Sequence, residues 1–480
     1  MIPESELIRE RKAKREACLK EGRAPYGGRF LPIGPISEVL SDFKEGRQVR
    51  LAGRITARRS HGKSTFCDLR DERARIQIYT KEDLLGAEGY EQFSRLDLGD
   101  IIGLEGKLFV SKMGERTVKV EKFTLLSKIL RVLPEKWHGL KDVEIRYRHR
   151  YVDLIVNEEV RKTFRIRSEI LREIRSFLDA RGFQEVETPM MQPIPGGARA
   201  RPFMTHHEAL HTDLYLRVAP ELYLKRLLVG GMERVYEVNR NFRNEGISVR
   251  HNPEFTMLEL YEAYADYTDM MLLTEELMTH LVKKIHGKEE IVYGEQPISF
   301  KRPWRRISFF EALKEKTRVD WRKVDVKKEA KRIDVEFDPG DEEIDVLSTV
   351  FEKVVEPDLW NPTFVVDYPA ELTPLAKPKV EDPGLVYRFE LYIGRLEIAN
   401  AFSELNDPVI QRQRLEKQVE IIGGSKKVDE DFLMALEYAM PPAGGLGIGI
   451  DRLVMILTNR PSIREVILFP QLRPETKGEA

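Results

Sequence analysis

The sequence is poor in cysteine and contains no long apolar run. Cys18 and Cys67 are the two cysteines among 480 residues, too few for a disulfide framework or a cysteine-ligated zinc site. No segment approaches the roughly 18 consecutive apolar residues of a membrane-spanning helix, and the N-terminus lacks the apolar core of a signal peptide. That basic terminus also carries four glutamates up to Glu16, which argues against an organellar transit peptide. We therefore expect a cytoplasmic protein with no membrane partner.

The chain also has almost no net charge. Its 79 lysines and arginines oppose 80 aspartates and glutamates, so any nucleic-acid-binding surface must be local. A composition of 41% hydrophobic and 33% charged residues is typical of a globular protein rather than a disordered one. The length allows two or more domains, each with its own core.

The hydrophobic patterns divide the chain into three regions and predict an α+β fold. Residues 1–30 contain a basic helix, expected over 5–21, and a turn-rich linker. Residues 31–133 form a small β domain. Residues 134–480 form a larger domain with an antiparallel sheet flanked by helices, and the charge-mixed segment 287–362 is expected to be an insertion on its surface.

The small β domain has the alternation of five short strands between residues 48 and 127, with a small helix expected from Leu84 to Phe93. This pattern is typical of an OB-type Greek-key barrel, whose open face commonly takes single-stranded nucleic acid, although other small barrels share it. The stretch from Gly46 to Lys63 holds six cations and no acid. Phe66, Gln77 and Tyr79 can add stacking and base-edge contacts. Nucleic-acid binding and a merely solvated face both remain open.

Residues 234–264 predict two antiparallel strands joined by a loop. On the first strand Glu237, Asn239, Asn241 and Arg243 share one face, and on the second Phe255, Met257, Glu259 and Tyr261 share one face. This alternation is typical of a pair with one buried face and one working face.

Glu259 is costly in an apolar strand unless it meets a cation or hydrogen-bond donors. An internal salt-bridge network is one explanation. However, Arg243, Glu245, Arg250 and His251 crowd the same strand–loop junction, and internal pairs seldom concentrate on a loop. A ligand that carries both charge signs is the other explanation.

Flanking segments add helices and loops. A helix is expected over 160–180 and a strand, FQEVETP, is expected to stop at Pro189. The helix is an ordinary core element or part of a subunit interface. PGGAR at 195–199 is a flexible loop through which backbone amides can approach a ligand. Glu221 lies in the first turn of a helix, where a carboxylate is electrostatically favoured without any function.

Two C-terminal stretches carry further candidate residues. Residues 386–405 are expected to form a strand in which a bulge at Gly394 brings Glu390 and Glu397 together. Magnesium takes one or two carboxylates beside phosphate, although a pair of surface acids is the simpler explanation. Residues 443–458 predict a glycine-rich strand turning into a helix, with Arg452 placed to reach an anion. No P-loop lysine follows those glycines.

Three of these stretches together resemble the motifs of class II aminoacyl-tRNA synthetases. They are the helix and strand ending at Pro189, the strand–loop–strand FRNEG…RHNPEF, and GLGIGIDR. With an OB-type barrel before them, they resemble the subgroup specific for lysine, aspartate or asparagine. APELYLKRLLVGGMERVYEVNRNFRNEG and EIANAFSELNDP are similar to the bacterial-type lysyl-tRNA synthetases. The resemblance covers nearly the whole chain, with weaker stretches near the N-terminus and at 287–362.

This resemblance implies the nucleotide site. Arg243 would bind the α-phosphate of ATP and the substrate carboxylate, Phe255 would stack on adenine, and Arg452 would take the γ-phosphate, which makes the two arginines the catalytic residues. Mg²⁺ would be carried by Glu390 and Glu397. The full set of implied ATP-binding residues is Arg243, Glu245, His251, Asn252, Phe255 and Arg452.

The resemblance also implies a pocket for L-lysine. Gly197 and Glu259 would hold the α-amino group, and an ammonium at the end of a long side chain needs buried acceptors. An aspartate-specific enzyme would need a cation there instead. The residues that match the family's side-chain pocket are Glu221, Tyr261, Asn400, Phe402 and Glu404.

The implied activity is lysine–tRNA ligation by a homodimer. The lysine carboxylate attacks the α-phosphorus of ATP, and the lysyl group then passes to the 3′ end of tRNA(Lys). On the barrel, the implied anticodon-binding residues are Arg58, Phe66, Gln77 and Glu115. The alternatives are a catalytically inactive paralogue that binds RNA and a synthetase for aspartate or asparagine.

Overall fold

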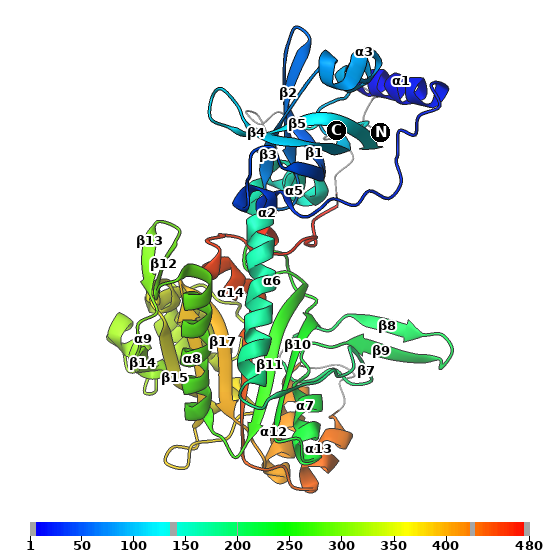
Figure 1. The fold of residues 1–480 in the computed structure, drawn as a ribbon. Helices are drawn as coiled ribbons and strands as arrows, with labels where there is room; N and C mark the ends of the chain where they lie inside the picture. Colours follow the sequence, from blue (N-terminus) through cyan, green and yellow to red (C-terminus); the bar gives the residue numbers. More distant parts are fainter. Residues whose placement is uncertain (1–5, 135–141, 199, 423–427, 475–480) are drawn as a thin grey trace. The chain divides into compact units, whose positions relative to one another are not determined.

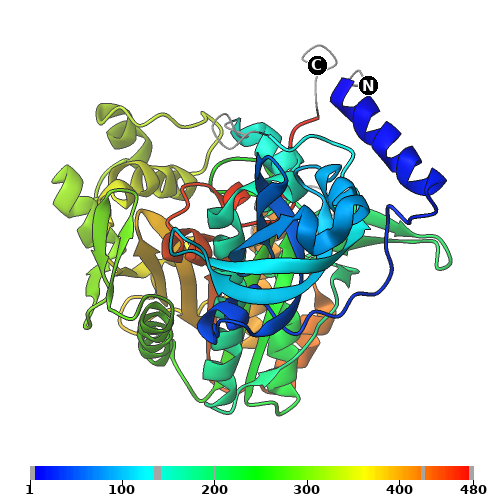
Figure 2. The same cartoon turned by 45° about the horizontal axis from the view of Figure 1, so that its top comes forward.

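The computed structural model describes residues 6–134, 142–198, 200–422 and 428–474. It divides into two compact units, one built on Met1–Lys141 and the other on Asp142–Pro474. The first is drawn in blue to cyan in Figures 1 and 2. Within the described ranges, no helix is both long enough and apolar enough to cross a membrane. Ser5, the first residue of the predicted N-terminal helix, lies outside the described residues.

The first unit is a closed barrel with strand order β1-β2-β3-β5-β4, which confirms the predicted OB-type domain. Along β3 every second residue is buried, as a barrel with one packed face requires. The helix predicted over Leu84–Phe93 extends from Glu82 to Ser94. The elements are α1 (Glu6–Lys20), α2 (Ile36–Ser41), α3 (Glu82–Ser94), β1 (Gln48–His61), β2 (Ser64–Arg70), β3 (Arg75–Lys81), β4 (Ile101–Val110) and β5 (Arg116–Ser127).

The second unit contains an eight-stranded sheet, ordered β14-β15-β16-β17-β18-β11-β10-β6. Neighbouring strands are antiparallel except at the two edges, where β14 pairs with β15 and β6 with β10 in parallel. The predicted sheet is thus confirmed, with parallel edges. Its strands are β6 (Gln184–Glu185), β10 (Arg234–Phe242), β11 (Glu254–Ala263), β14 (Arg305–Ser308), β15 (Thr363–Pro369), β16 (Leu385–Ile393), β17 (Leu396–Ser403) and β18 (Ala443–Gly449).

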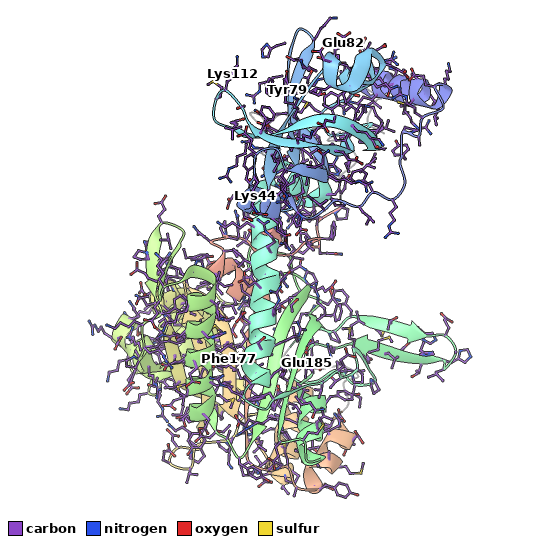
Figure 3. All side chains as sticks on the ribbon, viewed as in Figure 1. Lys44, Tyr79, Glu82, Lys112, Phe177 and Glu185 are labelled. Atoms are coloured by element: carbon purple, nitrogen blue, oxygen red, sulfur yellow. The ribbon has the colours of Figure 1, made fainter. Side chains whose placement is uncertain are left out.

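Apolar helix faces pack against one side of this sheet. Ile170, Ile174 and Phe177 recur at helical spacing on α6 and join the core with Leu258 and Leu260 of β11; Phe177 is labelled in Figure 3. The opposite side of the central strands remains available for a site. The helices are α4 (Val143–Arg148), α5 (Arg150–Val156), α6 (Glu158–Asp179), α7 (Glu221–Val229), α8 (Tyr267–His286), α12 (Pro408–Ile422), α13 (Glu430–Glu437) and α14 (Ile450–Leu457).

Two predicted strands differ from the structure. Residues 386–405 form a hairpin, β16 and β17, rather than one bulged strand, because Gly394 and Arg395 both have positive φ values (59° and 66°) and reverse the chain. Glu390 and Glu397 therefore lie on neighbouring strands. The FQEVETP strand is only two residues long, Gln184–Glu185, because it pairs at the sheet edge with just two residues of β10.

The segment 287–362 is not the predicted surface insertion, because it supplies the edge strand β14 and shares a second hydrophobic core with Tyr368 of β15 and Tyr392 of β16. Phe309 and Phe351 stack within this core with ring centroids 4.7 Å apart. The segment also contains β12 (Glu290–Tyr293), β13 (Gln296–Ser299), α9 (Phe309–Thr317), α10 (Val326–Arg332), α11 (Glu343–Val354) and η1 (Glu356–Asp358). A separate three-stranded sheet contains β7 (Met191–Gln192), β8 (Met204–His207) and β9 (Thr212–Leu216).

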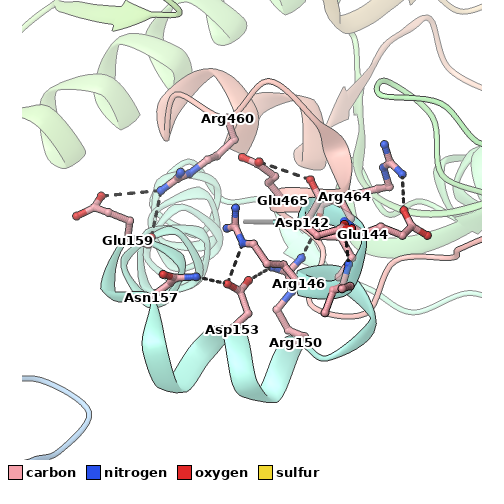
Figure 4. A network of polar contacts seen from close by, with 12 residues as sticks. Asp142, Glu144, Arg146, Arg150, Asp153, Asn157, Glu159, Arg460, Arg464 and Glu465 are labelled. Atoms are coloured by element: carbon pink, nitrogen blue, oxygen red, sulfur yellow. Dashed lines mark hydrogen bonds and ion pairs between the residues drawn. The ribbon is translucent and has the colours of Figure 1, made fainter. Parts of the chain in front are cut away.

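A buried arginine fixes the C-terminal segment to α5 (Figure 4). The guanidinium of Arg150 is paired with Asp153 at 2.7 Å and donates to the carbonyl oxygens of Arg464 at 2.7 Å and Leu468 at 3.0 Å. Arg146 donates to the same aspartate at 3.0 Å. Arg150 thereby satisfies backbone groups that water cannot reach.

We expect Arg150→Met to lower the free energy of unfolding by about 3–5 kcal/mol, because Asp153 then stays buried with only one cation and two carbonyls lose their donor. Denaturant titration measures the loss. Lys283→Met, which removes one partner of an exposed ion pair with Glu289, is the matched control and leaves the midpoint nearly unchanged. Equal losses in the two variants would contradict the assigned role of Arg150.

Candidate active site

A cavity of about 420 Å³ lies on the sheet face opposite α6, α8 and α14. Its floor is β18, in which Gly445, Gly447 and Gly449 line the cavity and alternate with the core residues Leu446 and Ile448. Because successive strand residues point to opposite faces, one face of β18 carries no side chains. The glycines therefore create the depth of the cavity.

The neighbouring strands place polar side chains on both sides of this floor. Gly447 is paired with Glu259 on β11 and with Asn400 on β17, and Gly445 is paired with Tyr261 on β11. A Cβ atom on Gly445 would lie 1.9 Å from Glu404 Oε1 and 2.6 Å from the Tyr261 ring. Glycine is required there because the Glu404 and Tyr261 side chains occupy that space.

The cavity gathers nearly all the residues predicted for ATP and lysine. Glu390 is the predicted residue of this unit that does not line it. The lining includes Gly197, Glu221, Arg243, Glu245, His251, Asn252, Phe255, Glu259, Tyr261, Glu397, Asn400, Phe402, Glu404 and Arg452.

One end of the cavity is cationic and aromatic. The guanidinium of Arg243 lies over the Phe255 ring, 5.0 Å from its centroid, and its buried Nε has no hydrogen-bond partner. Burial lowers the pKa of Arg243, although the Glu397, Glu245 and Glu259 carboxylates oppose the shift. Among the described residues no carboxylate forms an ion pair with this arginine, so an anionic ligand would satisfy it.

Arg452, at the start of α14, extends this cationic end. It donates to the Glu397 carboxylate at 3.1 Å and contacts His251 Nε2 at 3.1 Å. Burial, and then the positive charge of Arg452, lower the pKa of His251 below its ordinary value. His251 is therefore a neutral hydrogen-bonding group near neutral pH.

Asn252 has a structural task in addition to its place at the cavity wall. Its side-chain amide donates to the carbonyl of Glu254 at 2.6 Å and accepts from the backbone N–H of Gln471 at 3.1 Å. It thus ties the strand-connecting loop to the C-terminal segment. Glu245 is exposed at the cavity mouth.

The other end of the cavity is closed and acidic. Glu259 accepts hydrogen bonds from Tyr261 at 3.4 Å and Asn241 at 3.5 Å, and burial, reinforced by Glu221, raises its pKa to about 8. Burial also raises the pKa of Glu404 to about 8 against the opposing charge of Lys225. Three buried carboxylates, Glu221, Glu259 and Glu404, thus share one enclosed space.

The amino-acid end includes a backbone position that only glycine tolerates. Gly197 has φ +88°, and a Cβ there would lie 3.0 Å from the Cβ of Ala219 and 3.2 Å from that of Glu221. The loop therefore approaches α7 closely.

Two residues at the site escaped the sequence predictions: Arg388, which lines the cavity, and Lys225, which contacts two of the lining carboxylates. Lys225 is fully buried, 2.6 Å from a Glu221 oxygen and in contact with Glu404. A lysine four residues after a glutamate in an apolar helix was the available signal. Arg388 donates to Asn400 at 3.1 Å and also to Glu390 and Thr373. Nothing in the sequence marked its partners, because they come from separate segments.

Glu390 and Glu397 differ in their surroundings. Glu390 accepts hydrogen bonds from Tyr368 and Tyr392, both at 2.7 Å, and from Arg388, whereas the Glu397 side chain is 38% exposed. Where the structure is described, no cluster of three or more potential ligands can hold a metal ion unaided. Glu397 is thus the more accessible of the two carboxylates, with Arg452 as its partner at 3.1 Å, and Glu390 is engaged with several protein donors.

On the barrel, three of the four predicted anticodon residues share the outer surface. The rings of Phe66 and Tyr79 lie 4.7 Å apart, and Tyr79 is labelled in Figure 3. Gln77 lies on the next strand and hydrogen-bonds to Glu115. Together they form a half-buried aromatic and amide surface.

Arg58 lies apart from this surface. Its pairing partner on β2 is Cys67, and its guanidinium donates to the Leu96 carbonyl at 2.7 Å. Arg59 is the residue opposite Phe66. A register shift between Ile55 and Ala57 sets which arginine faces outward.

The fold and this cavity are those of a class II synthetase. Residues 142–473 match the family model of class II tRNA synthetases (D, K and N), and residues 49–126 match the OB-fold nucleic acid binding domain. The chain belongs to the class II tRNA synthetase family.

Three curated relatives within this family share one name. A protein from Carboxydothermus hydrogenoformans is 56% identical, with 98% of each chain covered. One from Pelotomaculum thermopropionicum is 57% identical over 98% of this chain and 95% of its own length. One from Moorella thermoacetica is 53% identical over 98% and 99%. All three are named lysine–tRNA ligase.

We expect Gly445→Ala to raise the KM for the amino-acid substrate by at least about tenfold, because the added methyl displaces Glu404 and Tyr261. The KM for ATP, measured in the same pyrophosphate-exchange assay, changes little. Gly340→Ala, where an added Cβ meets no atom within 4 Å, controls for the methyl group itself. An unchanged amino-acid KM in Gly445→Ala would show that these side chains do not form the pocket.

Proposed function

We propose that this protein is a lysine–tRNA ligase that activates L-lysine with ATP and transfers it to tRNA(Lys). The observation that carries the proposal is the closed acidic end, where Glu221, Glu259 and Glu404 are buried together and Lys225 pairs with the first and the last of them. Lysine brings two ammonium groups to this space. Aspartate would add a carboxylate to three buried ones, at a large desolvation cost.

The charges along the cavity determine the orientation in which lysine binds. Glu259 faces the α-ammonium and the end formed by Glu221, Tyr261 and Glu404 holds the ε-ammonium, which leaves the lysine carboxylate toward Arg243. A site built on such hydrogen bonds can reject an amino acid that lacks them by about 10⁴–10⁵-fold. Gly197 supports the pocket by letting the 195–198 loop lie against α7.

Adenylate formation needs no protein base, because the lysine carboxylate is already a nucleophile. It attacks the α-phosphorus of ATP, the bond to the bridging oxygen breaks, and pyrophosphate leaves. Arg243 stabilises the charge that develops on the α-phosphate, and Arg452 binds the outer phosphates. Phe255, beneath Arg243, offers its ring to the adenine. The tRNA 3′-hydroxyl then displaces AMP from the lysyl-adenylate.

A magnesium ion bound to ATP fits this donor set. Mg²⁺ takes one or two carboxylates and completes its coordination with phosphates and water, so Glu397 and, after it releases a donor, Glu390 would hold it. When bound, it neutralises phosphate charge.

The remaining partners follow from the two units. The barrel surface around Phe66, Gln77 and Glu115 would bind the anticodon bases by stacking and base-edge contacts. Exposed methionines next to and on the small β7–β9 sheet, Met190, Met191 and Met204, favour a homodimer interface. The free thiols Cys18 and Cys67 fit a cytoplasmic location.

Purified protein incubated with ATP, lysine and labelled pyrophosphate is expected to exchange label into ATP, because adenylate formation is reversible. Aspartate or asparagine in place of lysine supports no exchange. Label incorporation into ATP is the measurement. Exchange that depends on aspartate or asparagine, or an absence of lysine-dependent exchange, would contradict the proposal, and the latter would favour an inactive RNA-binding paralogue.

Phe66→Ala is expected to raise the KM for tRNA by about 5- to 100-fold through loss of base stacking. Lysine-dependent exchange stays at the wild-type rate, since the barrel takes no part in it. Phe66→Tyr keeps the ring and serves as the matched control, with near-normal tRNA charging. Equal losses of charging and exchange in Phe66→Ala would place this residue outside anticodon recognition.

A further inference from the structure

Lys225 lies on α7 next to the acidic end of the cavity, where it contacts two carboxylates that line the cavity but is not itself part of the lining. Its ammonium lies 2.6 Å from Glu221, contacts Glu404 and lies 5.4 Å from the centroid of the Phe402 ring. The side chain has no exposure to solvent. A fully buried lysine is rare unless it is paired, and its two partners here are the carboxylates proposed to bind the substrate ε-ammonium.

The charges of the closed end balance only if Lys225 is counted. Three carboxylates, Glu221, Glu259 and Glu404, are buried there. The substrate brings two ammonium groups, and its own carboxylate belongs to Arg243. Without Lys225 one ionised carboxylate would remain uncompensated, a state that buried sites avoid by taking up a proton.

The carboxylate of Glu404 is oriented for a ligand as well as for Lys225. Although Lys225 Nζ contacts one of its oxygens, neither buried oxygen receives a hydrogen bond of good geometry from the described residues. Glu221, in contrast, accepts a well-formed bond from Lys225. Glu221 and Glu404 are thus both in contact with the Lys225 ammonium. Their oxygens can still accept hydrogen bonds from a second cation.

We propose that Lys225 is a positioning residue for the amino-acid substrate, a permanent third cation that holds the Glu221 and Glu404 carboxylates toward the ε-ammonium and favours the ionised form of Glu404. This inference rests on the proposed lysine specificity.

The titratable groups that face Lys225 come from three segments. They are Glu221 on α7, Glu404 after β17, and Glu259 with Tyr261 on β11. Burial by itself would lower the pKa of Lys225. The negative charges of Glu221 and Glu404 have the larger effect, so the pKa of Lys225 lies above its ordinary value. Lys225 therefore stays charged, and its charge lowers the pKa of Glu404, which burial holds at about 8.

Removing Lys225 should have opposite effects in two backgrounds. In the wild type, Lys225→Met leaves three carboxylates for two ammonium groups, so the KM for lysine rises about tenfold or more near pH 7. In Glu221→Gln, two carboxylates already face three cations. There, adding Lys225→Met restores the balance and lowers the KM for lysine relative to Glu221→Gln alone.

The experiment measures kcat/KM for lysine by pyrophosphate exchange between about pH 6 and pH 9.5. Wild-type protein, Lys225→Met, Glu221→Gln and the double variant are compared, with the KM for ATP as internal control and Lys283→Met as the surface control. A carboxyl that must lose its proton to bind lysine gives a rising limb below its pKa. We expect Lys225→Met to shift this limb to higher pH, because Glu404 loses the cation that lowers its pKa.

The outcomes separate this inference from the proposed function. If the wild type shows no lysine-dependent exchange, the function fails. If the wild type exchanges but Lys225→Met keeps the same pH limb and raises the KM in both backgrounds, Lys225 has only a packing role. If the single variant does not fold, the double variant compared with Glu221→Gln decides, and a higher KM in the double variant overturns the inference.

Discussion

Burial of three carboxylates in one enclosed space is the constraint on which the site depends. Glu221, Glu259 and Glu404 come from a helix, a strand and a strand end that are far apart in sequence. Each loses hydration on folding, and burial raises the pKa of two of them to about 8. Such a cluster is costly unless cations join it. The buried carboxylates therefore reduce the stability of the empty protein. Binding of an amino acid with two ammonium groups would offset this cost.

The rest of the second unit supports that pocket. Helices α6, α8 and α14 pack on one side of the sheet, so the alternate residues of β11, β17 and β18 are left facing the cavity. Glycines on β18 provide the depth, and Arg243 and Arg452 provide the opposite charge at the other end. One sheet thus carries a cationic end and an acidic end on the same face, an arrangement that suits adenylate formation from ATP and lysine.

Local patterns in the sequence predicted the parts that depend on periodicity. The alternation in residues 234–264 predicted an antiparallel pair of strands, and the pairing of β10 with β11, across which Asn241 hydrogen-bonds to Glu259, confirms it. The five-strand barrel was predicted in the same way. The hairpin turn at Gly394 was not predicted, because nothing in the sequence indicates that Arg395 adopts a positive φ value. Arg388 was missed because its partners meet only in the folded chain. The spacing of Glu221 and Lys225 was a local signal, but the second partner of Lys225, Glu404, is distant in sequence. The register shift near Ile55 had no signal in the alternation.

Titration calorimetry of lysine binding to the wild-type protein, in buffers of different ionisation enthalpy, tests the central claim most directly. In the empty pocket Glu259 and Glu404, with pKa values of about 8, are largely protonated at pH 7, and they must be ionised to face the two ammonium groups. The account predicts release of about one proton or more per lysine bound at pH 7, with the release vanishing above about pH 9. Binding with no proton release at pH 7, or with proton uptake, would contradict it.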